Sequence, residues 1–158
     1  MVKKNLIITL LERRAKNYIE IVENYFENIG INPKKRRIER FDSIMWWFKK
    51  GTAIIFISLR EYEGSITLYI YSPILYLPEK KKLSFYKKCL ELNMTLINCA
   101  LAILEDKVIL ISKRPVLGLG SEEFEGTFKY LSETADIVDN KLADEFDLKL
   151  YLEKPDES

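Results

Sequence analysis

The sequence predicts an α+β fold in which helices pack on one face of an antiparallel β-sheet of about five strands. Long apolar stripes with helical spacing lie near both ends of the chain. Between them, short strand patterns are separated by turn residues, which is typical of an antiparallel meander. A further helix and a strand pair complete the expected order α-β-β-β-α-β-β-α.

The composition suits one globular domain. Of the 158 residues, 47% are hydrophobic and 31% are charged. A chain of this length buries enough surface to fold without a metal or a disulfide. We expect a single domain over residues 1–152 and a flexible polar tail over residues 153–158.

Charge and targeting signals narrow the classes of partner. The net charge of +1 gives no overall attraction to nucleic acid or to an anionic membrane. No apolar run approaches the roughly 18 residues of a membrane span, and no signal-peptide pattern follows the amino terminus. We expect a cytoplasmic protein.

Cys89 and Cys99 form no CxxC pair, and we expect buried thiols there.

Residues that usually supply catalytic chemistry are scarce. Histidine, the commonest general base and metal ligand, is absent. The acidic residues Glu61, Glu63, Glu105 and Asp106 fall in predicted turns, where carboxylates are ordinarily solvated. We therefore expect no enzymatic activity, no metal and no cofactor.

The first helix is predicted over about residues 6–28. Its apolar residues recur at steps of three and four, which places them on one face. They are Ile8, Leu11, Ala15, Tyr18, Val22, Tyr25 and Ile29. Gly30 follows the stripe, in the usual position of a left-handed helix cap.

A basic segment, Lys34–Arg40, comes next. It could bind phosphates or an acidic partner, or it could be a solvated connector. We favour the connector, because no flanking aromatic run supports a nucleic-acid module. A nucleic-acid-binding or regulatory protein that uses this segment is the alternative function.

Three strands are predicted after the basic segment. They cover Ser43–Lys49, Ala53–Leu59 and Ser65–Tyr71, with turn residues between them. Pro73 and Pro78 are expected to end the pairing, because proline lacks the N–H of a sheet ladder.

The meander has two faces, because successive strand residues point to opposite sides of a sheet. The first face is suited to packing against helices and comprises Ile44, Trp46, Phe48, Ile55, Ile57, Leu59, Ile66, Leu68 and Ile70. The second face is richer in aromatic side chains and comprises Met45, Trp47, Ile54, Phe56, Thr67, Tyr69 and Tyr71.

The second face is too apolar to be left open to water. We expect a second subunit or a bound partner to cover it, and the alternatives are a slip in strand register or a helix of the same chain. Aromatic residues are frequent among the hot spots of interfaces. The predicted protein-binding residues are Trp47, Phe56, Tyr69 and Tyr71.

A second helix is predicted over about residues 79–94, with Pro78 at its start. Its expected apolar stripe is Leu83, Tyr86, Leu90 and Met94. Two apolar runs, Ala100–Leu104 and Val108–Ile111, then flank a polar link and predict a hairpin at the centre of the sheet.

The last helix has the most regular stripe, formed by Phe124, Phe128, Leu131, Ala135, Val138, Leu142 and Phe146. Ser121 is its expected N-cap, and Glu122 and Glu123 lie near the positive end of the helix dipole. We expect this helix to lie on the sheet beside the first helix rather than to form a coiled coil. Residues 148–152 are expected to pair briefly at a sheet edge.

The order of elements and a short set of motifs resemble a known family. Leu92-Asn93 ends the middle helix, the hairpin ends in Lys113-Arg114, and the apolar link Val116–Leu119 leads to the helix opened by Ser121. Over about residues 5–146 the chain is similar to the small type III secretion chaperones and the YbjN-type domains. The resemblance implies a helix–sheet sandwich that dimerises and binds polypeptide without catalytic residues.

The near-neutral charge favours an adaptor-like role over secretion, because secretion chaperones tend to be acidic. From the resemblance and the aromatic sheet face together, we expect a non-enzymatic polypeptide-binding homodimer.

Overall fold

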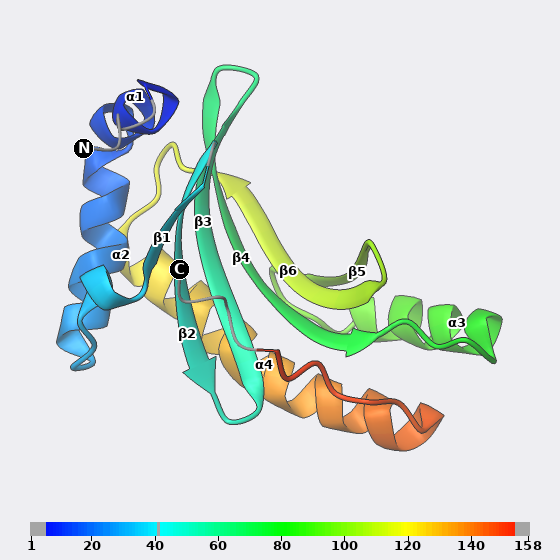
Figure 1. Ribbon diagram of the computed structural model, residues 1–158. Coiled ribbons are helices and arrows are strands. Elements are labelled where there is room, and N and C mark those ends of the chain that lie inside the picture. Colours follow the sequence, from blue (N-terminus) through cyan, green and yellow to red (C-terminus); the bar gives the residue numbers. More distant parts are fainter. Residues whose placement is uncertain (1–5, 41, 154–158) are drawn as a thin grey trace.

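The computed structural model describes residues 6–40 and 42–153 (Figure 1). Its helices and strands are α1 (Leu6–Arg14), α2 (Lys16–Asn28), the 3-10 turn η1 (Pro33–Lys35), β1 (Arg37–Arg40), β2 (Ser43–Lys50), β3 (Ala53–Tyr62), β4 (Ser65–Tyr76), α3 (Lys82–Asn93), β5 (Ala100–Leu104), β6 (Lys107–Pro115) and α4 (Ser121–Phe146).

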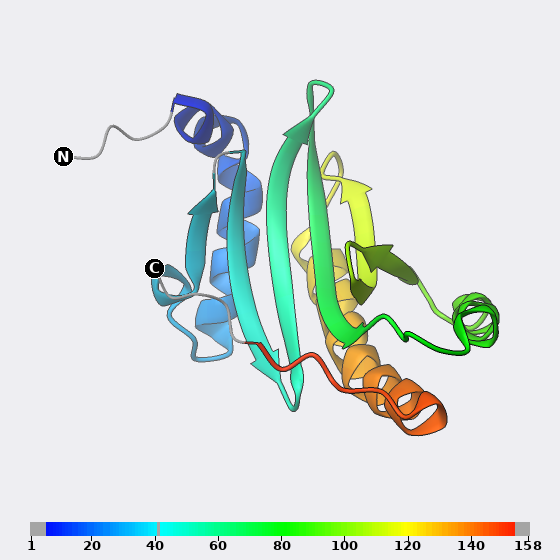
Figure 2. The same ribbon diagram turned by 45° about the vertical axis from the view of Figure 1, so that its right-hand side comes forward.

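The strands form one antiparallel sheet in the order β1-β2-β3-β4-β6-β5. Helices α2 and α4 lie behind the sheet in Figure 2, and no helix of the described residues lies in front of its strands. The predicted α+β architecture with helices on one face is therefore confirmed, with six strands rather than about five. The additional strand, β1, comes from the basic segment.

The hairpin of β5 and β6 lies at the edge of the sheet, so the prediction that it is central is wrong. β6 pairs along β4 from Thr67 to Tyr76, and β6 is the only described strand that pairs with β5. The hairpin turn is tight, because Leu104 pairs directly with Lys107. Glu105 in this turn has a φ of +55°.

The first predicted helix is divided into two. Ala15 leaves helical geometry with a φ of −96° and a ψ of 8°. The bonds from Ala15 N–H to the Leu11 carbonyl and from Ile19 N–H to the Ala15 carbonyl persist, at 2.8 and 2.9 Å. The break is therefore a kink, which lets α1 contact β2 while α2 packs against α4. Gly30 ends α2 with a φ of +79°, as the sequence predicted.

β4 continues past Pro73, where pairing was expected to fade. Pairing with β3 stops at Tyr71, so Pro73 lies beside β6 alone, and a bulge follows before Leu75. Proline is tolerated in such a position because no second strand needs its N–H. The segment after α4 then contacts this free part of β4, where Tyr151 N–H donates to the Ile74 carbonyl at 2.9 Å.

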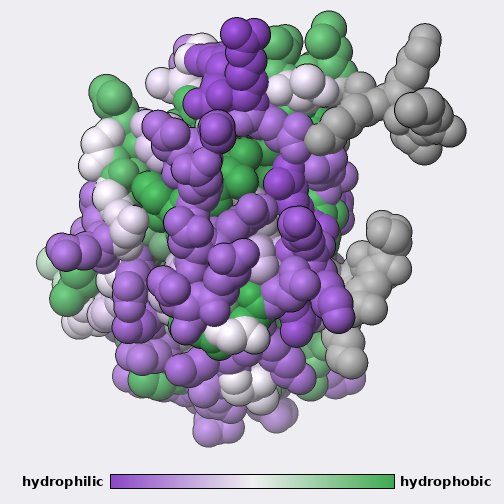
Figure 3. All heavy atoms as spheres, turned by 90° about the vertical axis from the view of Figure 1, so that its left-hand side faces the viewer, coloured by the Kyte–Doolittle hydropathy of each residue, from purple (hydrophilic) through white to green (hydrophobic). Residues whose placement is uncertain are grey.

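The hydrophobic core lies between the helices and the inner face of the sheet. The predicted helix-facing residues of β2, β3 and β4 are buried there, apart from Phe48, which is partly exposed. The stripe of α4 is likewise buried, apart from Phe146, which is partly buried. Gly120 rather than Ser121 precedes the helix as its cap. The side of the molecule in Figure 3 is largely hydrophilic, and the residues that α2 exposes are polar. Within the described ranges, no helix is long and apolar enough to cross a membrane.

One buried carboxyl group sits where α4 meets the turn between β2 and β3. The Thr52 hydroxyl lies 3.1 Å from both Asp136 Oδ1 and Asp139 Oδ2. Gly51 permits this approach, because a Cβ there would lie 2.4 Å from Asp136 Oδ1. The Thr52 hydroxyl has one proton, so it can donate a hydrogen bond to only one of the two carboxylates at a time. Burial raises the pKa of Asp139 to about 6, from an ordinary value of 3.8.

This pKa predicts a specific pH dependence. A carboxyl whose pKa is raised on folding stabilises the fold below about pH 4, and that contribution is lost as the pH rises through about 6. Asp139→Asn should remove the decrease in stability between about pH 4 and 6, because an amide does not ionise. It should also raise the free energy of unfolding at pH 7.5 by about 1 kcal/mol, because the amide can donate a hydrogen bond to the Thr52 hydroxyl. Urea unfolding at pH 4 to 8 measures both curves. Parallel curves for the variant and the parent would contradict the assignment.

Candidate protein-binding surfaces

The four predicted binding residues lie together on the outer face of the sheet, the face without helices. Trp47 pairs across strands with Phe56, and Phe56 pairs with Tyr71. Tyr69 lies in the neighbouring row, opposite Ser58. The structure thus brings these side chains together from β2, β3 and β4.

The rings on this face contact one another and nearby arginines. Phe56 and Tyr71 stack with centroids 5.2 Å apart and planes 21° apart. The Arg36 guanidinium lies 4.0 Å from the centre of the Trp47 ring, which is 9% exposed. Burial raises the pKa of Tyr71 above its usual value. The aromatic side chains are therefore held in place before any partner arrives.

A hollow of about 220 Å³ opens beside these rings. We call it the outer-face hollow, and it is lined by Met45, Ser58, Arg60, Tyr69, Tyr71, Leu104, Ile109 and Ile111. Tyr69 and Tyr71 therefore belong to its wall, while Trp47 and Phe56 do not line it. Ile109 and Ile111 were missed because alternation alone does not reveal that β6 lies beside β4.

The basic segment is divided between the two faces of the sheet, which corrects its prediction as a solvated connector. Arg37 turns toward the helices, where it pairs with Glu12, with Glu23 at 3.3 Å and with Glu39 at 2.9 Å. Its guanidinium also lies 5.8 Å from the Trp46 ring. The segment is therefore not one exposed basic patch.

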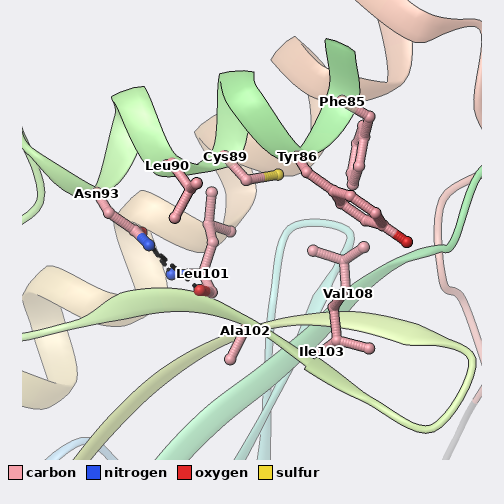
Figure 4. A pocket seen from close by; sticks show the side chains of 9 residues that line it. All are labelled: Phe85, Tyr86, Cys89, Leu90, Asn93, Leu101, Ala102, Ile103 and Val108. Carbon is pink, nitrogen blue, oxygen red and sulfur yellow. Dashed lines mark hydrogen bonds between the residues drawn. The ribbon is translucent and has the colours of Figure 1, made fainter. Parts of the chain in front are cut away.

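Asn93 connects the end of α3 to the edge strand β5 (Figure 4). Its Oδ1 accepts from the Leu101 N–H at 2.7 Å, and its Nδ2 donates to the Leu101 carbonyl at 3.3 Å. The side-chain amide thus occupies backbone groups that a further strand would otherwise use. Exposed sheet edges are templates for unwanted pairing. This gives a physical role to the Leu92-Asn93 motif.

Asn93→Ala should destabilise the protein by about 1–3 kcal/mol, because it leaves two partly buried backbone groups of Leu101 without partners. Urea unfolding measures the loss, and amide hydrogen exchange should show reduced protection at Leu101. The matched control is Asn17→Ala on an exposed position of α2, where we expect a change within about 0.5 kcal/mol. Equal effects of the two substitutions would count against a stabilising role for the hydrogen bonds between Asn93 and Leu101.

A second hollow, of about 240 Å³, lies between α3 and the β5–β6 hairpin (Figure 4). It is lined by Phe85, Tyr86, Cys89, Leu90, Asn93, Leu101, Ala102, Ile103 and Val108. Burial raises the pKa of the Cys89 and Cys99 thiols to about 11. Both are half-buried free thiols that stay protonated at neutral pH, in keeping with their expected role as small apolar groups.

The predicted stripe of α3 faces solvent, so that prediction is wrong for three of its four residues. The side chains of Leu83, Leu90 and Met94 are 83%, 68% and 86% exposed, whereas Phe85 is buried. The helix also begins at Lys82 rather than near Glu79. The physical reason is that α3 lies at the sheet edge and packs on β5 instead of crossing the sheet.

The acidic turn residues do not assemble into a site. Glu61 pairs with Arg14 at 2.5 Å, and Asp106 pairs with Lys107 at 2.8 Å. Within residues 6–40 and 42–153, no group of three or more potential metal-ligating side chains is found. The last described residue, Glu153, accepts a hydrogen bond from Tyr76, and the rest of the predicted flexible tail lies outside the described residues.

No family model and no curated protein matches the sequence. Among solved structures, the ExsC–ExsE complex aligns with a TM-score of 0.55 and 14% identity, over 88% of this chain and 97% of the other. The HopA1–SchA chaperone–effector complex aligns with a TM-score of 0.57 and 10% identity, over 78% and 93%. YbjN from E. coli aligns with a TM-score of 0.45 and 14% identity, over 84% and 95%. The first two likenesses show a shared fold and confirm the predicted secretion-chaperone-like architecture.

Proposed function

We propose that this protein is a non-enzymatic, chaperone- or adaptor-like homodimer that binds a polypeptide on the outer face of its sheet. The observation that carries the proposal is the outer-face hollow, an aromatic and aliphatic depression on a sheet whose other face is filled by helices. The fold supports it, since a structure with the same architecture is that of a chaperone–effector complex. Fold alone does not carry function, so the surface itself supplies the argument.

The outer face suits an extended chain. Alternate residues of one strand, such as Tyr69 and Tyr71 of β4, point to this face. They therefore repeat at the same spacing as the alternate side chains of an extended segment that lies along the strand. The rings are already packed against each other, which reduces the entropy lost when a partner binds. Phe56, Tyr69 and Tyr71 are partly exposed, so each has surface left to bury.

The interface of the proposed homodimer is better placed on α3 and the β5–β6 hairpin than on the outer face. Large apolar side chains that are more than half exposed gather there: Leu83, Leu90, Met94, Ile97 and Ile103. Exposed apolar groups of this extent are unusual on a monomer and are typical of subunit interfaces. Asn93 occupies the Leu101 edge groups, which favours contact through side chains rather than through a continuous sheet. A two-fold dimer would bury the same patch of both copies.

Selection from a random 12-residue peptide library tests the binding role. Peptides enriched by the parent protein should bind the double variant Phe56→Ser/Tyr69→Ser at least tenfold more weakly, because two aromatic contacts are removed. Fluorescence anisotropy with the synthesised peptides measures the affinities, and circular dichroism checks that the variant is folded.

The matched control removes exposed apolar side chains elsewhere. Leu117→Ser/Ile137→Ser alters residues that are 84% and 66% exposed, on the loop before α4 and on α4. This variant should bind the selected peptides as the parent does. If the parent enriches nothing beyond what the Phe56→Ser/Tyr69→Ser variant enriches, the proposed function is wrong.

A further inference from the structure

The outward-facing positions of the sheet carry charge of one sign. Their charged residues are Arg40 on β1, Lys49 on β2, Arg60 on β3, Lys107 and Lys113 on β6, together with Arg36 immediately before β1. Among the described residues, no aspartate or glutamate occupies an outward-facing strand position. A net charge of +1 for the whole chain conceals this asymmetry.

Several of these cations lack a counter-charge among the described residues. Lys107 pairs with Asp106 at 2.8 Å, and Arg60 pairs with Asp42 at 3.3 Å across two exposed side chains. Arg40 and Lys113 form no ion pair with any described residue. Exposed ion pairs such as that of Arg60 are weak and exchange readily with water. The face therefore has positive charge to offer a partner.

Three of these cations, Arg40, Arg60 and Lys113, lie around the outer-face hollow. Arg60 lines it, and Lys113 pairs across strands with Tyr69 of its wall. Arg40 and Arg60 both lie opposite Ser43, one strand away on either side. The positive charges of both arginines also reach the Tyr71 hydroxyl, where they act to lower its pKa against the larger effect of burial. An apolar depression is thus rimmed by positive charge.

From this arrangement we propose that the outer-face hollow binds an extended polypeptide segment in which acidic residues flank an aliphatic or aromatic side chain. The inference rests on the proposed polypeptide-binding function and adds the chemistry of the partner. The apolar side chain fills the hollow against Met45, Ile109 and Ile111. The flanking carboxylates pair with Arg40, Arg60 and Lys113, and arginine can hold a carboxylate in two parallel hydrogen bonds.

The same face suits a nucleic acid less well. Bases bind single-strand-binding proteins by stacking on free aromatic faces. Here Phe56 is stacked on Tyr71, and Trp47 lies beneath the Arg36 guanidinium. The lining of the hollow also includes Met45, Leu104, Ile109 and Ile111, which suit an apolar amino-acid side chain.

The test compares the charge of selected peptides with that of the unselected library. The parent protein is used to select from random 12-residue peptides, alongside the triple variant Arg40→Gln/Arg60→Gln/Lys113→Gln, which removes charge but keeps the side-chain stems. The control variant, Lys80→Gln/Lys82→Gln/Lys141→Gln, removes three exposed cations away from the outer face. A 20-nucleotide oligo-dT is titrated in parallel.

We expect the enriched peptides to be net acidic around one apolar residue, and to bind the triple variant at least tenfold more weakly than the parent or the control variant. Their affinity for the parent should fall as salt is raised. Enriched peptides of neutral or basic composition would overturn this inference and leave the polypeptide-binding function standing. Tighter binding of oligo-dT than of any selected peptide would overturn it in favour of nucleic acid. No enrichment at all would overturn both proposals.

Discussion

Replacing Leu90 and Met94 by glutamate should convert the proposed dimer into a monomer. Both side chains are more than two-thirds exposed, and they lie one helical turn apart on the same side of α3. In a two-fold interface each substitution acts twice, so four carboxylates would be buried against apolar groups. At about 1.4 kcal/mol per tenfold change in affinity, a loss of roughly 3 kcal/mol weakens association more than a hundredfold.

Light scattering coupled to size-exclusion chromatography measures the oligomeric state across a range of concentrations. The matched control is Leu117→Glu/Ile137→Glu, which adds the same charge to apolar residues that are exposed elsewhere. We expect the control to remain dimeric. A parent protein that is monomeric at every concentration, or a Leu90→Glu/Met94→Glu variant that stays dimeric, would rule out this interface.

Phe128→Ala should cost about 3–5 kcal/mol of stability, the range observed when a buried phenylalanine is removed from a core. Phe128 is 1% exposed, and its ring contacts Phe48 at 5.4 Å and Tyr25 at 5.2 Å between centroids. It also lies 6.3 Å from Phe26. The side chain thus joins α2, α4 and β2.

Urea unfolding measures this loss. Ile137→Ala, on the exposed side of the same helix, is the control, and we expect a change within about 0.5 kcal/mol. A loss below 2 kcal/mol for Phe128→Ala would mean that the helix–sheet interface repacks easily. Such a result would weaken the view that the inner face is the rigid support of the binding surface.

Features that repeat along one helix or strand were predictable from the sequence, whereas contacts between distant strands were not. Alternation along β2, β3 and β4 was enough to identify both faces of the meander, and a helical period was enough to identify the buried stripe of α4. These patterns are local, because burial of one face repeats every two or about 3.6 residues. They do not state which strand lies beside which.

The wrong predictions concern contacts between elements, which local periodicity does not indicate. α3 has an apolar stripe, yet Leu83 and Leu90 face solvent because the helix packs at the edge of the sheet rather than across it. The basic segment became β1 because Ile38 pairs with Met45, a contact that its own composition does not indicate. The outer-face hollow needs Ile109 and Ile111 beside Tyr71, and therefore needs β6 to pair with β4.

The sequence by itself determined the fold class, the inner face of the sheet and the aromatic side chains of the outer face, because each depends on the period of hydrophobic residues along a single element. The tertiary structure alone decided where the hairpin pairs, how Asn93 closes the edge of β5 and which cations surround the hollow. These features join residues far apart in the chain, and strand order sets them through backbone hydrogen bonds that every residue type can make.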